Sequence, residues 1–369
     1  MLPAHALPPP AIEQPASREV SFGVVAGDAA AGTRRVVVSA RGRVLASKPL
    51  GRRRFLLHVQ LPIGDVSVRV TTIAKDGRRS SRLVTGVYGL PATGSPRRTK
   101  EREDRGLAAE LRGLTRQFHG TTAFFVQSLT TGRGAGSNAK ARFPAASTLK
   151  LAIAAAVLSA QSGLPAPGSY VGLLLHSMLV YSDNASANAL ETWLGGSTTG
   201  GSHQIDALMR SIGMSDSIMY GGYETGTYAR SIPSHVDSQP EFGIGKYTTA
   251  SDLATLLRSI WLAAGSRGRL HSARPSFTPD DARYLLWLLA QVRDTAKLDG
   301  IVRRTRGVAV LHKAGWVSSA RHDAGLVFWR GGVFVASVMT WNPSGDGISA
   351  DRLAARCAAK ALARFDRRG

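Results

Sequence analysis

Three short motifs occur in a fixed order along this chain of 369 residues, and together they constrain what it can be more than any other feature. They are Ser147-Thr148-Leu149-Lys150, Ser182-Asp183-Asn184 and Lys313-Ala314-Gly315-Trp316. Each motif alone carries little information, because a serine three residues before a lysine occurs by chance in most proteins of this length. The order of the motifs and their surroundings give the set its weight.

The first motif lies at the start of a predicted helix. Residues 149–162 are rich in Ala, Leu and Ile, which indicates a buried helix beginning near Ser147. Residues three apart share a helix face, so Lys150 would lie one turn from Ser147 and share a proton with its hydroxyl. A buried lysine loses proton affinity and can act as a base. The alternative is that Ser147 only caps the helix while Lys150 extends to solvent.

The second motif follows an apolar helical stretch, residues 173–181, and precedes another helix. The hydroxyl of Ser182 can relay a proton to a leaving nitrogen, and the amide of Asn184 can bond an amide of a substrate. Asp183 is expected to brace the loop. The alternative is a simple capping turn, since Ser, Asp and Asn are typical cap and turn residues.

The third motif lies on a predicted strand that covers residues 307–313 and precedes a hairpin. Lys313 can direct its charge at a substrate carboxylate and at Ser182. Gly315 lacks a side chain where the backbone of a substrate would lie alongside the strand.

The ordered set resembles the penicillin-recognising serine hydrolases, which include class A β-lactamases and penicillin-binding proteins. The resemblance spans about residue 103 to the C-terminus. It implies an α/β/α sandwich with an antiparallel sheet and a helical subdomain. It also implies that Ser147 forms an acyl-enzyme, with an oxyanion hole made by the backbone N–H groups of Ser147 and Trp316.

One motif residue departs from the family pattern. Ala314 stands where the family usually has Thr or Ser, so a hydroxyl for the substrate carboxylate is missing. Arg321, which follows the strand, is a candidate to replace it. We expect His322 and Asp323, next along the chain, to be structural residues.

One expected part is absent from the sequence. Class A β-lactamases carry an E-x-x-L-N motif whose Glu activates the deacylating water. In the loop upstream of the helix that is predicted to start near Thr248, the candidate glutamates are Glu224 and Glu241, and neither is followed by Leu-Asn. We expect both to be solvated loop carboxylates, which predicts slow β-lactam hydrolysis. A D,D-peptidase or transpeptidase of the cell wall, or an inactive wall-binding protein with a scaffold catalytic domain, therefore stays open.

Composition shifts divide the chain into four predicted parts. Residues 1–17 are rich in Pro and Ala and are predicted to be a disordered tail. Residues 18–89 show short alternating segments typical of an immunoglobulin-like β-sandwich. Residues 90–104 are predicted to be a linker, and residues 105–369 the β-lactamase-like serine hydrolase domain.

The net charge of +22 predicts affinity for polyanions, since many arginines fall in the β domain and linker. The expected partners are a small-molecule β-lactam or a peptidoglycan peptide, and an anionic wall polymer or membrane surface for the basic β domain. No motif indicates nucleic acid, a metal or a cofactor. The family implies an extracellular or cell-envelope location, although no signal segment is visible at Met1.

Overall fold

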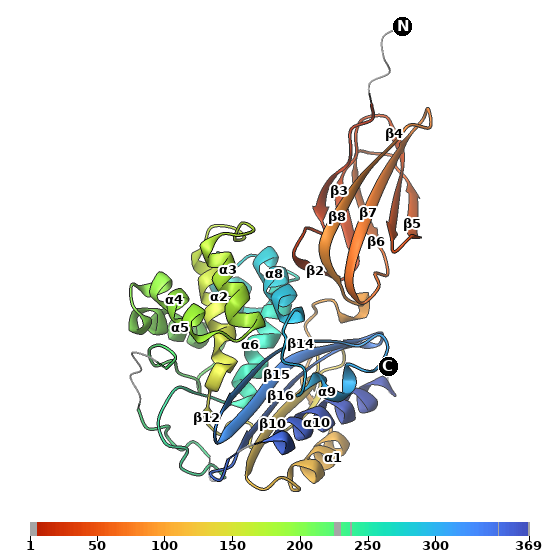
Figure 1. Ribbon diagram of the computed structural model, residues 1–369. Coiled ribbons are helices and arrows are strands. Elements are labelled where there is room, and N and C mark those ends of the chain that lie inside the picture. Colours follow the sequence, from red (N-terminus) through yellow and green to blue (C-terminus); the bar gives the residue numbers. More distant parts are fainter. Residues whose placement is uncertain (1–5, 225–229, 237, 346, 368–369) are drawn as a thin grey trace. The chain divides into compact units, whose positions relative to one another are not determined.

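The computed structural model describes residues 6–224, 230–236, 238–345 and 347–367. The chain separates into two units, Met1–Ser95 and Pro96–Gly369, and each is described by itself. Their elements are labelled in Figure 1.

The N-terminal unit is built from two β-sheets, of strand order β1-β3-β6 and β2-β8-β7-β4-β5. Along β7, Val66, Val68 and Val70 are buried and alternate with more exposed residues, as a strand with one covered face requires. Phe55 and Leu57 of the smaller sheet join the same core, so the two sheets pack face to face. The predicted small all-β domain is confirmed. Its strands are β1 (Ala11–Gln14), β2 (Glu19–Ser21), β3 (Val24–Asp28), β4 (Thr33–Ala40), β5 (Arg43–Pro49), β6 (Arg54–His58), β7 (Gly64–Ala74) and β8 (Arg79–Gly89).

Two predicted irregular segments are partly structured. Strand β1 falls within residues 1–17 and pairs with β3, so the prediction of a disordered tail is wrong there. The prolines of this segment flank β1 and do not interrupt it, and Ile12 packs against the core. In the predicted linker, β9 (Arg102–Glu103) pairs in parallel with β11, and a 3-10 turn, η1, covers Ala92–Gly94.

The C-terminal unit is organised around a six-stranded sheet of order β14-β15-β16-β10-β11-β9. All neighbouring strands are antiparallel except β11 and β9. The strands are β10 (Thr121–Ser128), β11 (Arg133–Ser137), β14 (Ala309–Val317), β15 (Ala320–Trp329) and β16 (Gly332–Trp341). The last three form consecutive hairpins, as the sequence predicted.

Helices cover both faces of this sheet (Figure 1). Helices α1 and α10 pack on one face, in a core with Phe124, Val327 and Phe334. Helix α6 packs on the other face with the helical subdomain beside it, whereas the short helix α9 lies with α10, so the predicted α/β/α sandwich with a helical subdomain is confirmed. The helices are α1 (Arg105–Thr115), α2 (Lys150–Ala160), α3 (Tyr170–Val180), α4 (Asn184–Gly195), α5 (Thr198–Ile212), α6 (Ala250–Ala263), α7 (Gly268–Ala273), α8 (Pro279–Ala290), α9 (Asp299–Val302) and α10 (Ile348–Asp366).

A separate two-stranded sheet joins the segment before the first motif to the segment before α6. It pairs β12 (Phe143–Pro144) with β13 (Tyr247–Thr248). The hydrogen bond from Ala145 N to Lys246 O, 2.8 Å long, extends this pairing toward Ser147. No helix among the described residues is long and apolar enough to cross a membrane.

Candidate active site

Ser147 lies in a 3-10 turn, η2 (Ala146–Leu149), that leads directly into α2. The predicted helix therefore begins with a tighter first turn. Ala146 has a left-handed backbone with φ of 48°, a conformation that costs a non-glycine residue about 1–2 kcal/mol. Ser147 is partly exposed while Thr148 and Leu149 are buried, so the turn presents the serine at the surface of the fold.

Strand β14 passes directly beside this turn at Gly315. A Cβ atom at Gly315 would lie 2.7 Å from the Ser147 nitrogen and 2.8 Å from the Thr148 nitrogen. No side chain fits at that distance. The sequence assigned Gly315 to a substrate backbone, and the structure shows that it is needed first for the approach of the Ser147 turn.

Lys150 is fully buried and points toward the second motif. Its Nζ donates hydrogen bonds to the backbone oxygen of Ser182 and to Oδ1 of Asn184. Within the described residues, no hydrogen bond joins Lys150 to the Ser147 hydroxyl, so the predicted direct bond is absent in this state. A buried ammonium takes the acceptors that lie around it, and here these come from the loop at residues 182–184.

Ser182 connects the two motif lysines. Its backbone oxygen accepts from Lys150, and its Oγ accepts from Lys313 Nζ at 2.9 Å. Ser182 has a φ of 62°, a second left-handed non-glycine residue in the site. This strained backbone turns one residue toward both cations, and strain of this kind clusters at functional sites. Lys313 is buried and also donates to the oxygen of Ala314.

Burial changes the protonation of both lysines. It lowers the pKa of Lys150 to about 8, against the opposing effect of Asp183 and Glu224. Burial, helped by the charge of Lys150, lowers the pKa of Lys313 to about 7. Lys150 therefore has an uncharged fraction near neutral pH, which a general base requires.

Glu224 is an exposed loop carboxylate, as predicted, but its side chain also reaches the site. Its Oε1 accepts a hydrogen bond of 2.6 Å from Nδ2 of Asn184, the residue that accepts from Lys150. The carboxylate is exposed on its other side. Tyr223, the residue before it, exchanges two backbone hydrogen bonds with the Asn188 side chain, which holds the loop on α4. Glu241 is exposed, as predicted.

Two further motif residues, Asp183 and Trp316, lie at the start of α4 and on β14. Asp183 caps α4 and accepts from Ser186 N at 2.6 Å, as expected for a bracing residue. The Trp316 side chain is about half exposed, and Lys297 Nζ lies 5.0 Å from its ring centroid. The role predicted for Trp316 belongs to its backbone N–H, and stays a prediction.

Arg321 does not lie in the cleft. It pairs opposite Trp316, and its guanidinium donates to Asp351 of α10 at 2.9 Å. Side chains alternate along a strand, so Arg321 shares the face of Val327 in the core beneath α10, whereas His322 faces the Ser147 side. The prediction that Arg321 replaces the missing hydroxyl is wrong in this structure.

The comparisons with known proteins agree with this geometry. Residues 106–165 and 161–365 match the model of the family described as the beta-lactamase enzyme family. The chain belongs to the beta-lactamase enzyme family. No curated protein sequence matches this member of the family.

Solved structures of the beta-lactamase fold resemble this family member over most of their own length. PBP-A superposes with a TM-score of 0.57 at 19% identity, covering 73% of this chain and 98% of that one. The ancestral class A β-lactamase GNCA gives 0.55 at 20% identity, covering 70% and 100%. A β-lactamase from Xanthomonas campestris gives 0.54 at 19% identity, covering 71% and 97%. These likenesses establish the fold.

His322 anchors the segment before Ser147, so its predicted structural role has a concrete form. Its Nε2 bonds the Pro144 oxygen at 2.8 Å, and its Nδ1 accepts from Thr340 N at 3.3 Å. This arrangement uses the neutral imidazole, with one donor and one acceptor. Asp323 instead bonds His312 and Leu298 N beneath the sheet.

We expect His322 to make this protein acid-sensitive. Burial lowers its pKa to about 4, from the usual 6.5. The unfolded chain then binds the proton first, so stability is full above pH 6.5 and falls as the pH drops toward 4. The loss is about 3 kcal/mol at most. Urea unfolding of wild type and His322→Gln between pH 7 and 4 measures the difference. If the free energy of unfolding changes with pH by the same amount in both proteins, His322 does not cause the acid sensitivity.

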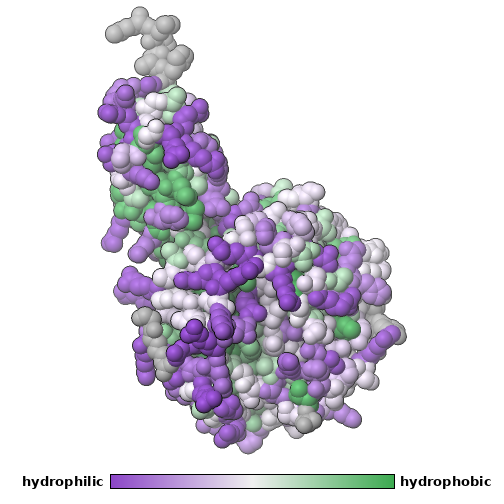
Figure 2. Space-filling view, turned by 180° about the vertical axis from the view of Figure 1, so that it is seen from behind, coloured by the Kyte–Doolittle hydropathy of each residue, from purple (hydrophilic) through white to green (hydrophobic). Residues whose placement is uncertain are grey.

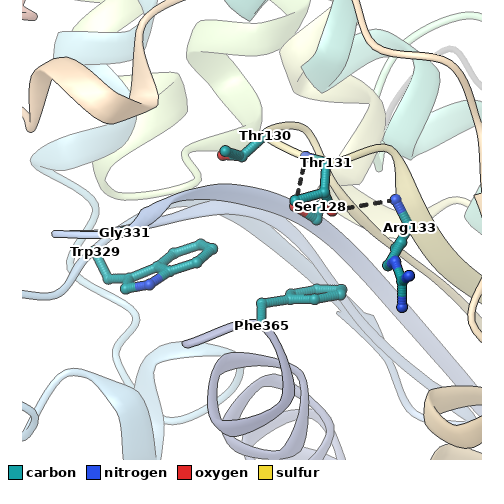
Figure 3. A pocket seen from close by; sticks show the side chains of 7 residues that line it. All are labelled: Ser128, Thr130, Thr131, Arg133, Trp329, Gly331 and Phe365. Atoms are coloured by element: carbon teal, nitrogen blue, oxygen red, sulfur yellow. Dashed lines mark hydrogen bonds between the residues drawn. The ribbon is translucent and has the colours of Figure 1, made fainter. Parts of the chain in front are cut away.

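The cavity in Figure 3 is separate from the predicted site. It has a volume of about 340 Å³ and lies where the β10–β11 turn, the β15–β16 hairpin and the end of α10 meet. Trp329 and Phe365 form its floor in this view, with Ser128 and Thr131 above. Trp329 is at the opposite end of β15 from His322, so this cavity takes no part in the chemistry proposed for Ser147.

Proposed function

We propose that this protein is a serine hydrolase of the class A β-lactamase type, which forms an acyl-enzyme through Ser147 on β-lactams or related amides. The convergence of two buried lysines on Ser182, beside the Ser147 turn, supports this best. Desolvation of two cations in one place costs several kcal/mol, and such costly groups cluster at functional sites.

Acylation follows from the roles of these groups. The Ser147 oxygen forms a bond to the carbonyl carbon, and the carbon–nitrogen bond of the amide breaks. Uncharged Lys150 accepts the proton of Ser147, and Ser182 passes a proton to the leaving nitrogen. Lys313, held on Ser182, attracts the carboxylate of the substrate. Backbone N–H groups of Ser147 and Trp316 would bind the developing oxyanion.

Deacylation is assigned to Glu224. Its bond to Asn184 places a carboxylate, exposed on one side, next to the residue that bonds Lys150. A water on that exposed side can lose a proton to Glu224 as it attacks the ester. This assignment revises the expectation of slow hydrolysis drawn from the missing E-x-x-L-N motif.

A solved relative supports the acylation half of the proposal. A variant of PBP-A, 20% identical to this chain, has been solved as an acyl-enzyme complex with penicillin G. The fold alone does not distinguish a β-lactamase from a wall peptidase, so the peptidase stays the alternative function.

Intact mass recorded over time after mixing with benzylpenicillin tests the proposal. A hydrolase shows a covalent adduct of the mass of the β-lactam, followed by return of the free mass. A persistent adduct favours the peptidase or acyl-trapping alternative. The absence of any adduct at millisecond to hour times, together with intact antibiotic in solution, would leave the inactive scaffold as the correct description.

We further propose that the N-terminal unit binds an anionic wall polymer or anionic membrane surface outside the cytoplasm. Arginines on its strands and turns are exposed, and hydrophilic side chains border an apolar strip on this unit in Figure 2. Such attraction weakens with salt.

The test is sedimentation with phosphatidylglycerol vesicles or isolated cell wall. In one variant, three exposed arginines of this unit are replaced by Ser: Arg34, Arg43 and Arg52. In the matched control variant, three exposed arginines of the C-terminal unit are replaced by Ser: Arg303, Arg304 and Arg306. Equal losses would indicate net charge alone.

A further inference from the structure

A third lysine, Lys246, lies beside the site although no motif contains it. It precedes β13 and is buried. Its Nζ donates hydrogen bonds to three consecutive carbonyl oxygens, those of Tyr220, Gly221 and Gly222, at 3.0, 3.0 and 2.6 Å. An ammonium has three donors and no acceptor, so these carbonyls satisfy its charged form completely.

Lys246 joins two segments of the site. Its backbone oxygen accepts from Ala145 N at 2.8 Å, two residues before Ser147. Its side chain holds residues 220–222, which lead directly to Glu224. The nucleophile turn and the loop carrying Glu224 are therefore tied to the same residue.

The ring of Tyr223 is close to the ammonium groups of two lysines. Lys150 Nζ is 4.6 Å from its centroid and Lys246 Nζ is 4.5 Å from it. Each ammonium is attracted to the electron-rich ring. Since both lie about 4.5 Å from one point, the two nitrogens are at most about 9 Å apart, close enough for their charges to interact in a buried site.

We propose that Lys246 is a positioning residue of the acyl-transfer site. It holds the loop of Glu224 against the segment that carries Ser147. It also lies beside the same Tyr223 ring as Lys150, and there its charge favours the base form of Lys150. This inference rests on the function proposed above.

The charges around Lys150 set the direction of the expected effect. It is faced by the carboxylates of Asp183, Glu191 and Glu224, by the phenol of Tyr223, and by the ammonium groups of Lys246 and Lys313. The carboxylates raise the pKa of Lys150, whereas burial and Lys246 lower it. Removing the charge of Lys246 therefore raises this pKa, by about one unit for charges some 9 Å apart at an effective dielectric constant of about 20.

Lys246→Met tests the proposal, since it removes the charge and the three donors while keeping the length of the side chain. The pH midpoint of benzylpenicillin acylation, followed by intact mass, should rise by about one unit. Deacylation should slow at least about tenfold, because Glu224 loses its fixed place. Hydrogen exchange at residues 217–224 should become faster. Lys246→Arg, which keeps the charge, should restore the midpoint.

Controls separate this inference from the proposed function. Burial raises the pKa of Glu191 to about 8 and lowers that of Lys246. If Lys246→Met does not fold, the pair Lys246→Met with Glu191→Gln takes its place. Loss of Glu191 lowers the pKa of Lys150 and so offsets the rise of the midpoint, and in this pair the deacylation rate and hydrogen exchange are the deciding measurements. If the wild-type protein forms no adduct, the proposed function is wrong. Hydrogen exchange at residues 217–224 of Lys246→Met then still tests whether Lys246 holds the loop of Glu224. A variant that melts earlier but keeps the wild-type midpoint and deacylation rate overturns the positioning role.

Discussion

We expect Ser147→Ala to abolish the covalent adduct with benzylpenicillin. The substitution removes the oxygen that bonds the carbonyl carbon, and no neighbouring group among the described residues stands in its place at the Ser147 turn. We expect no adduct by intact mass at times when the wild-type protein is fully labelled. Loss of a nucleophile of this kind reduces turnover by about 10⁶-fold in serine hydrolases.

The same variant should fold as the wild type does. Ser147 is partly exposed, and its described contacts are those of its backbone beside Gly315. Such a substitution changes the free energy of unfolding by about 0.5 kcal/mol or less. Labelling that persists in Ser147→Ala, at an unchanged melting temperature, would place the nucleophile elsewhere.

We expect Glu224→Gln to convert a transient acyl-enzyme into a lasting one. Glutamine has the size of glutamate and its oxygen can still accept from Asn184, so the loop keeps its place. An amide does not take a proton from water, so hydrolysis of the ester should slow by on the order of 10²–10⁴-fold while acylation proceeds. Burst kinetics with a chromogenic cephalosporin measure both steps in one experiment.

Glu241→Gln is the matched control, because it removes the same charge from an exposed position. Wild type and this variant should release the acyl group at equal rates. If wild type already retains the adduct for hours, or if Glu224→Gln turns over at the wild-type rate, the assignment of the deacylating base is wrong.

Local patterns predicted most of the fold. The apolar run after Ser147, the β-rich segment ending at Lys313 and the Gly-Gly turn at residues 331–332 all form the predicted elements. Each pattern depends on residues within one helix or hairpin, where periodicity decides which face is buried. The order of the motifs then identified the family. Within that family it indicated Ser147, Lys150, Ser182, Asn184 and Lys313 as candidates, and the structure brings all five together.

Errors arose where the answer depends on contacts between distant segments. Arg321 was assigned to the cleft from its place in the sequence, but the side-chain alternation of β15 puts it beneath α10 on Asp351. Residues 11–14 had the composition of a tail, yet β3 offers a strand edge for them to pair with.

Sequence by itself determined the family, the sheet and helices, and the motif residues, because these follow from patterns within short segments and from their order. Only the tertiary structure decided that Glu224 meets Asn184, 40 residues away, and that Lys246 reaches three carbonyls more than 20 residues before it. Neither residue belongs to a motif. A loop carboxylate and a basic residue before a strand are common on any surface. The hydrogen bond of Glu224 to Asn184 and the burial of Lys246 near Lys150 make them part of a site.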